Sequence, residues 1–212
     1  MMVRWQWDQL RATYDTIASK YEERFLDELK DKPRDRELLS AFAASVRDPV
    51  LEVGCGPGQI GAFIRKQGRC VMGLDLSSEM ANLATHRLDG ALVGDMRSLP
   101  LAQESLGGLV AFYSIIHVQR PELRVVLSEF RRVVRPGGRV LIAVHEGRGV
   151  VEHNRFLEVP VPSIATLYEL DELVAASRAV GLDVLNAERR EPYPSESTVR
   201  LFVEASAMAL PE

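Results

Sequence analysis

The sequence has few cysteines, few histidines and no long apolar run. Its 212 residues include two cysteines, Cys55 and Cys70, and four histidines, which form neither a CxxC pair nor a zinc-type spacing. We therefore expect reduced cysteines and no metal site. No apolar run approaches the ~18 residues of a membrane-spanning helix. The segment 1–15 lacks the apolar stretch of a secretory signal. These absences predict a cytoplasmic protein without a membrane partner.

An excess of positive charge is also missing. The chain carries 26 Lys and Arg against 30 Asp and Glu, a formal net charge of −4. Proteins that bind nucleic acids by neutralising phosphates are normally basic, so a nucleic-acid partner is not expected. Hydrophobic residues make up 46% of the chain and charged residues 26%, which is typical of a globular protein with a buried core. The length favours a single domain.

The hydrophobic pattern changes along the chain. Residues 1–47 are predicted to be helical, and strands and helices alternate from about residue 50. The predicted strands are 50–53, 70–74, 91–93, 109–113, 139–144, 182–189 and 198–207. The predicted helices between them are 60–66, 77–87, one starting at Pro121, and 171–180, with a loop over 147–166. This alternation indicates an α/β fold with a doubly wound, mostly parallel sheet.

A glycine-rich turn follows the first strand. The sequence EVGCGPG places Gly54, Gly56 and Gly58 at alternate positions after Glu52, so the backbone can turn tightly and approach a ligand. A dinucleotide fingerprint, GxGxxG, would need glycine where Gln59 stands, and no Lys-Ser or Lys-Thr follows as in a P-loop. A tight turn without a ligand remains an alternative.

Acidic residues end the second and third strands. A carboxylate at Asp75 can accept both hydroxyls of a ribose, as in other open α/β sheets. The alternative is a helix-capping Asp, although Ser77 and Ser78 already offer caps. Asp95 can accept from an exocyclic amine, and Met96 offers an adaptable apolar surface for a flat ring. Three consecutive strand ends therefore predict a nucleoside-type ligand.

These motifs together resemble those of class I S-adenosylmethionine-dependent methyltransferases of the small-molecule type. The matching segments are 51–58, 73–76, 94–96, 112–118 and 127–141, within a resemblance that spans roughly residues 10 to 205. The resemblance implies S-adenosylmethionine as cofactor. It also implies a Rossmann-like seven-stranded sheet of order 3-2-1-4-5-7-6 with strand seven antiparallel. Residues 1–47 would then be a helical lid, 48–146 the cofactor-binding core, and 147–212 a substrate-side insertion with the C-terminal strands.

The resemblance also assigns cofactor-binding residues. Asp75 would hold the ribose hydroxyls, Leu76 would pack on the adenine, and the glycines would pass close to the methionine part. The end of the fourth strand would offer backbone carbonyls near the sulfonium, and Tyr14 and Tyr21 would close over the cofactor, unless they merely pack an amphipathic helix. The full set is Tyr14, Tyr21, Glu52, Gly54, Cys55, Gly56, Gly58, Asp75, Leu76, Asp95, Met96, Phe112 and Tyr113.

The sequence does not identify a general base. Methyl transfer needs one only if the acceptor must lose a proton. His117 follows the fourth strand, and His145 and Glu146 end the fifth, so these three are the candidates for catalysis or substrate contact. His153 would lie in the loop above the site, and His86 is expected on a solvated helix face.

The acceptor is expected to be a small molecule. The stretch 113–116, YSII, replaces the Asn-Pro-Pro-Tyr-type tetrad of amino-methylating relatives, and the insertion 147–166 carries apolar residues suited to a small pocket. Two alternatives stay open: a non-catalytic cofactor-binding member of the fold and a nicotinamide-dependent oxidoreductase. Either a monomer or a homodimer is compatible with the sequence.

Overall fold

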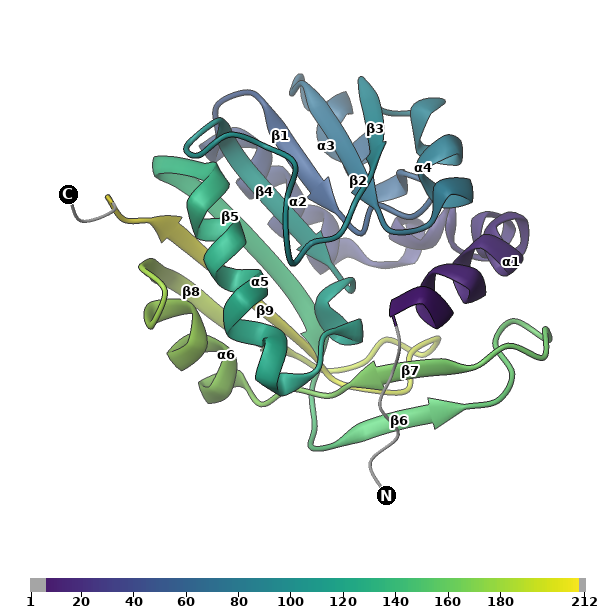
Figure 1. The fold of residues 1–212 in the computed structure, drawn as a ribbon. Helices are drawn as coiled ribbons and strands as arrows, with labels where there is room; N and C mark the ends of the chain where they lie inside the picture. The colour runs from purple at the N-terminus through teal and green to yellow at the C-terminus, as the bar shows by residue number, and fades with distance from the viewer. Residues whose placement is uncertain (1–6, 210–212) are drawn as a thin grey trace.

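The computed structural model describes residues 7–209 and contains a mixed seven-stranded sheet flanked by helices (Figure 1). The N-terminal part holds α1 (Trp7–Phe25), the short 3-10 helix η1 (Glu28–Asp31) and α2 (Pro33–Ser45). The central part holds β1 (Val50–Val53), α3 (Gln59–Lys66), β2 (Val71–Asp75), α4 (Ser78–Thr85), β3 (Gly90–Val93), β4 (Leu106–Phe112), the 3-10 helix η2 (Ile115–His117), α5 (Arg120–Val133) and β5 (Val134–His145). The last part holds β6 (Val150–His153), β7 (Ser163–Thr166), α6 (Leu170–Arg178), β8 (Leu182–Arg190) and β9 (Arg200–Ala207).

The strand order is β3-β2-β1-β4-β5-β9-β8. The five strands from β3 to β5 pair in parallel, whereas β9 is antiparallel to both β5 and β8. The last two core strands, β8 and β9, are the sixth and seventh predicted from the sequence. The predicted order, with an antiparallel seventh strand, is therefore confirmed.

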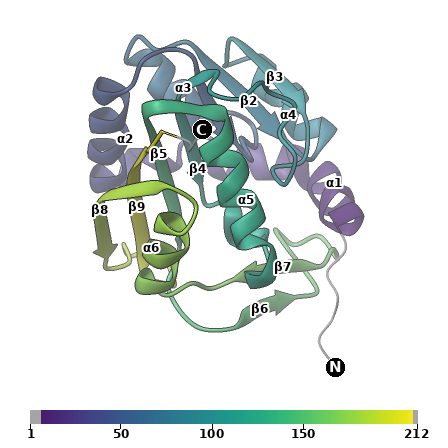
Figure 2. The same ribbon diagram turned by 60° about the vertical axis from the view of Figure 1, so that its left-hand side comes forward.

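Helices cover both faces of the sheet, as the continuously apolar strands require. In β4, Leu109 packs with α5 and Val110 packs with α2, and the whole strand is buried. Figure 2 shows α5 and α6 on the face opposite α2 and α3. A buried leucine or phenylalanine contributes about 1.5–3 kcal/mol relative to exposure, so Phe42 and Phe130, each at most 1% exposed, anchor the two faces.

The prediction of a loop over 147–166 is wrong in part. Residues within it form the antiparallel hairpin of β6 and β7, with Val150 opposite Thr166 and His153 opposite Ser163. Each strand is only four residues long, and a proline-containing connection of nine residues separates the two strands. The alternating apolar pattern of each strand is therefore too short to detect in the sequence. The hairpin lies beside α1 (Figure 1), where the Thr13 hydroxyl donates to the carbonyl of Pro162 at 3.1 Å.

The start of β5 also differs from expectation, since the strand begins at Val134 rather than near residue 139 and includes Gly137 at a φ of +76°. Within residues 7–209, no helix combines the length and apolar character needed to cross a membrane.

Candidate functional site

A cavity of about 440 Å³ lies at the carboxyl ends of the parallel strands. Residues of α1 and of the β6–β7 hairpin line it from the side opposite the strand ends. The residues predicted from the sequence that line it are Tyr14, Tyr21, Glu52, Gly54, Cys55, Gly56, Asp75, Leu76, Asp95, Met96, Phe112, Tyr113, His117 and His145. Tertiary structure therefore gathers nearly all of them around one space.

The glycine loop after β1 adopts a conformation that favours glycine. Gly54 and Gly56 have φ of +66° and +52°, in the left-handed region. A Cβ on Gly54 would overlap the Cβ of Ser114, so the loop passes directly over the end of β4. Gly58 does not line the cavity. At a φ of +85° it starts α3, and an added Cβ would lie 3.2 Å from Ala84.

Asp75 is held by two backbone amides. Its Oδ2 accepts from the Gly56 N–H at 2.8 Å and its Oδ1 from the Ser77 N–H at 2.9 Å. Burial raises the pKa of Asp75 to about 6 although both hydrogen bonds lower it. Ser77 itself caps α4, because its Oγ accepts from the Met80 N–H at 3.1 Å. The helix-capping alternative for Asp75 is thus excluded, and spare lone pairs remain on its carboxylate.

Glu52 lies beneath the glycine loop. It is 2% exposed, and its Oε2 accepts from the Gly61 N–H in α3 at 2.8 Å. Burial raises the pKa of Glu52 well above its ordinary value. This carboxyl group fixes the loop against α3 while it also lines the cavity.

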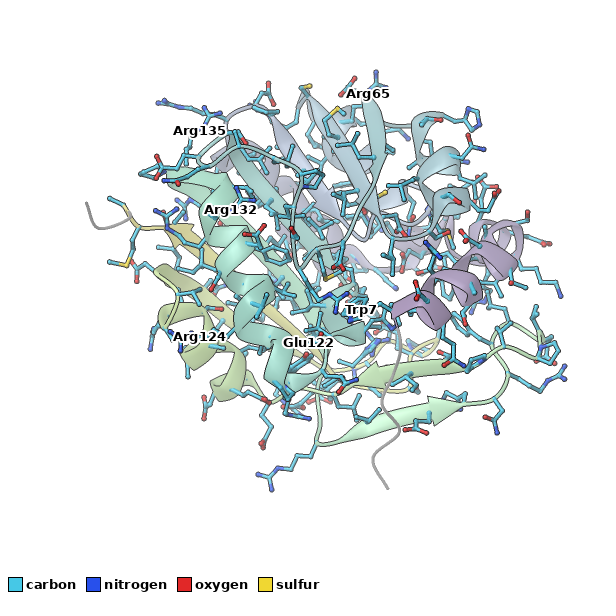
Figure 3. All side chains as sticks on the ribbon, viewed as in Figure 1. Trp7, Arg65, Glu122, Arg124, Arg132 and Arg135 are labelled. Atoms are coloured by element: carbon cyan, nitrogen blue, oxygen red, sulfur yellow. The ribbon has the colours of Figure 1, made fainter. Side chains whose placement is uncertain are left out.

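Asp95 has a partner that sequence reasoning missed. Arg97 binds both of its oxygens, with Nη2 to Oδ2 at 2.6 Å, and also donates from Nη1 to Glu122 at 2.9 Å. The Arg97 guanidinium lies 4.2 Å from the ring centre of Trp7, whose indole N–H donates to Glu122 at 3.3 Å. Figure 3 shows Trp7 at the start of α1 beside Glu122 of α5. These contacts fasten α1 to the edge of the cavity next to Met96.

Three aromatic rings form the wall contributed by α1 and the hairpin. Tyr14 lies 5.8 Å from Tyr21 and 6.3 Å from Phe156 between ring centres, and Tyr21 lies 6.3 Å from Phe156. The two tyrosines therefore face the cavity, as a lid would require. The contribution of Phe156 depends on the hairpin and was not evident from the sequence.

His117 is buried in a single tautomer. Its Nδ1 lies 2.8 Å from the carbonyl oxygen of Ile164, which can only accept, so Nδ1 carries the proton. Its Nε2 then accepts from the Tyr14 hydroxyl at 2.8 Å. Burial lowers the pKa of His117 to about 4, which keeps the ring neutral at pH 7. Both ring nitrogens of the neutral imidazole are therefore engaged in hydrogen bonds within the protein.

The other two candidates differ in position. His145 lines the cavity and stacks on Tyr113, with ring centres 5.3 Å apart at 13°. Glu146 points away from the cavity and accepts from Arg189 at 2.8 Å, so the structure does not place it with the other site residues. His153 lines the cavity, whereas His86 does not.

A group of charged residues at the β5–β9 side of the cavity was also missed. Lys32 and Arg200 line the cavity there, and Glu196 lies close to both, at 3.6 and 3.5 Å. These residues come from segments more than 160 positions apart, so no local sequence pattern indicates them. Within residues 7–209, no three His, Cys, Asp or Glu side chains are arranged to hold a metal ion.

Comparisons with known proteins agree with this geometry. A family model described as a methyltransferase domain matches residues 50–138. The chain is 27% identical to an uncharacterized methyltransferase of Geobacillus kaustophilus over 139 residues, which cover 64% of this chain and 63% of that protein. It is 38% identical to a malonyl-[acyl-carrier protein] O-methyltransferase of Pectobacterium atrosepticum over 109 residues, covering 50% and 42%. The match thus spans less than two thirds of either relative.

Solved structures share the fold. The structure superposes with a TM-score of 0.75 on a Burkholderia thailandensis 1,6-didemethyltoxoflavin-N1-methyltransferase, which holds 1,6-didemethyltoxoflavin and S-adenosylhomocysteine. The two chains are 21% identical, and the alignment covers 95% of this chain and 88% of that one.

Proposed function

Because the chain carries a methyltransferase domain of the class I S-adenosylmethionine-dependent type, we propose that it methylates an oxygen, nitrogen or carbon nucleophile of a small molecule. The observation that carries this proposal is the convergence of the glycine loop, Asp75 and the aromatic wall on one cavity. The malonyl-[acyl-carrier protein] O-methyltransferase and the 1,6-didemethyltoxoflavin-N1-methyltransferase act, by name, on an oxygen and on a nitrogen, so the proposal covers both kinds of nucleophile.

The residues of the cavity fit the cofactor. The left-handed backbone at Gly56 leaves open the position of a Cβ that would lie 3.6 Å from Tyr21, another residue of the cavity lining, and this space suits the methionine part of the molecule. Asp75 would accept from the ribose hydroxyls with its remaining lone pairs. Met96 and Leu76 would contact the adenine, next to the anchored carboxylate of Asp95. S-adenosylmethionine supplies a methyl group on a positively charged sulfonium.

The protein's own contribution is alignment and exclusion of water. Tyr14, Tyr21 and Phe156 would cover the reacting atoms, since they form the wall opposite the strand ends. Where the acceptor must lose a proton, His117 is the proposed base acting through Tyr14, because Tyr14 lines the cavity and its hydroxyl donates to Nε2. The acceptor proton would move to the Tyr14 oxygen as the Tyr14 hydroxyl proton moves to Nε2, while Nδ1–H keeps its hydrogen bond to the Ile164 carbonyl.

Thermal unfolding with S-adenosylhomocysteine and, separately, with NADH tests the proposal. A ligand at about 100 times its dissociation constant stabilises the folded state by ~2.7 kcal/mol, which raises the midpoint by a few degrees. We expect a shift with S-adenosylhomocysteine alone. A shift with NADH alone would favour an oxidoreductase and overturn the assignment.

A second measurement separates catalysis from binding. Product formation from labelled S-adenosylmethionine, screened over small nucleophiles, identifies the acceptor. Binding of S-adenosylhomocysteine with no turnover on any nucleophile class would favour a non-catalytic member of the fold.

A further inference from the structure

The cavity extends beyond the expected cofactor site to the side of the sheet formed by β5 and β9. Because β9 is antiparallel to β5, its first residue, Arg200, pairs with His145, the last residue of β5. Arg200 and His145 therefore lie at the same edge of the sheet as the ends of the parallel strands. With Lys32, Tyr113 and Thr198 they line this end of the cavity.

This end lies on the far side of the glycine loop from the ribose site. Arg200 on β9 is four strand positions from Asp75 on β2, and the glycine loop follows β1, which lies between them next to β2. If Asp75 holds the ribose and the glycine loop the methionine part, as proposed above, the space at Arg200 is left for the methyl acceptor.

Arg200 shares its carboxylate partner with a second arginine. Its side chain is about nine-tenths buried, and within residues 7–209 its one ion-pair partner is Glu196, 3.5 Å from Nε. Glu196 also binds Arg190 at 2.8 Å, and Arg190 pairs with the buried Asp35 at 3.0 Å. The Nε of Arg200 is buried without a hydrogen bond, and among the described residues Arg200 donates from Nη1 alone, to the carbonyl and hydroxyl of Thr198. The unused donors of this guanidinium can bind an acceptor group, and a carboxylate binds them most strongly.

The neighbouring groups also present donors. The Thr198 hydroxyl accepts from Arg200 and lies 3.1 Å from His145 Nδ1, to which it can donate. Burial lowers the pKa of His145 to about 3, so the ring is neutral. With Thr198 as the donor to Nδ1, the His145 proton is on Nε2, which then offers an N–H at this end of the cavity.

Lys32 adds a second cation at the same wall. Its ammonium group lies 5.7 Å from the ring centre of Tyr113, and Arg200 lies 5.4 Å from the same ring. The acidic residue that faces the cavity here is Glu28. Its two oxygens already accept from Lys32 at 2.5 Å and from Gln59 at 2.8 Å, so it offers little to a ligand that donates hydrogen bonds.

We propose that Arg200, together with His145 and Lys32, binds a carboxylate group of the methyl acceptor. The rest of the cavity near this wall is apolar and aromatic, with Tyr14 and Phe156 opposite the strand ends. The acceptor is accordingly a small carboxylic acid with an apolar body that carries the nucleophile toward the glycine loop. The proposal rests on the proposed methyltransferase function.

Calorimetry on protein saturated with S-adenosylhomocysteine tests this proposal with two probes of nearly equal shape, benzoate and benzamide. We expect benzoate to bind and benzamide to bind at least tenfold more weakly. Arg200→Gln should weaken benzoate at least tenfold and change the affinity for S-adenosylhomocysteine less than twofold. The matched control is Arg139→Gln, because Arg139 lies at the opposite end of β5, pairs across the sheet with Ser206 and does not line the cavity.

Equal binding of the two probes, no binding of benzoate at 20 mM, or an unchanged benzoate affinity in Arg200→Gln would each overturn the carboxylate subsite. A tenfold loss of S-adenosylhomocysteine affinity in Arg200→Gln would assign the arginine to the cofactor carboxylate instead. If that variant does not fold, Thr198→Val, which removes the hydroxyl that positions both Arg200 and His145, should weaken benzoate severalfold. Failure of the wild type to bind S-adenosylhomocysteine would refute the proposed function rather than the subsite alone.

Discussion

The ionisation of Asp75 makes cofactor affinity depend on pH within an accessible range. Its pKa of about 6 lies above the ordinary value because burial outweighs the hydrogen bonds from Gly56 and Ser77. Ribose hydroxyls bind best to a charged acceptor, so the ionised carboxylate is the form that binds. The affinity for S-adenosylhomocysteine should therefore be at its maximum above pH 7 and decrease as the pH falls through 6.

The magnitude follows from the fraction of Asp75 that is ionised. With a pKa of about 6, roughly one molecule in ten is ionised at pH 5, so the apparent dissociation constant should rise about tenfold between pH 7.5 and 5. This corresponds to ~1.4 kcal/mol of binding free energy, because one pH unit is worth that amount.

Isothermal calorimetry from pH 8 to pH 5 measures this change. Asp75→Asn cannot ionise, so its affinity should be lower at pH 7.5 by ~1–3 kcal/mol and nearly flat across the range. Asp183→Asn, on an exposed position of β8, should keep the wild-type profile. A flat wild-type profile, or a wild-type profile in Asp75→Asn, would refute the assignment of the ribose to Asp75.

Three further predictions concern the loop, a cap and the proposed base. Gly54→Ala should abolish S-adenosylhomocysteine binding and lower the melting temperature, because its Cβ would overlap Ser114, whereas Gly68→Ala, at φ +87° with no atom within 4 Å, should show only the backbone strain. Ser77→Ala should cost about 1 kcal/mol in unfolding free energy by denaturant titration, since it removes the cap of α4; an unchanged midpoint would contradict the cap. His117→Gln should lower kcat for an acceptor that loses a proton but leave the affinity for S-adenosylhomocysteine within twofold; equal losses of both would make the histidine structural.

Most of the fold could be predicted from the sequence because its signals are local. β1, β2 and β3 are short, mostly apolar runs that end at or next to a glycine or an acidic residue, and Ser77 marks the start of α4. The strand order came from the resemblance to a family rather than from periodicity. The β6–β7 hairpin escaped prediction because four-residue strands have too few alternations to distinguish from a loop.

Only some residues of the candidate site could be predicted correctly from the sequence. Glu52, Asp75 and Asp95 could be identified because each stands at or next to a predicted strand end, and parallel strands bring such ends to one edge. Gly58 was assigned to the cofactor by its place in the motif, yet the structure places it at the start of α3 against α4. Glu146 also fell at a strand end, but its side chain turns to Arg189 on the surface.

By itself, the sequence determined the class of fold, the position of the glycine loop and the identity of the carboxylates at the strand ends, because these depend on hydrophobic period and on neighbours within a few residues. Tertiary structure alone decided the tautomer of His117 and the donors gathered around Arg200. A proton's place on an imidazole and the charge balance of a buried arginine are set by atoms a few ångströms away. Those atoms belong to residues such as Ile164 and Glu196, whose approach only the folded chain specifies.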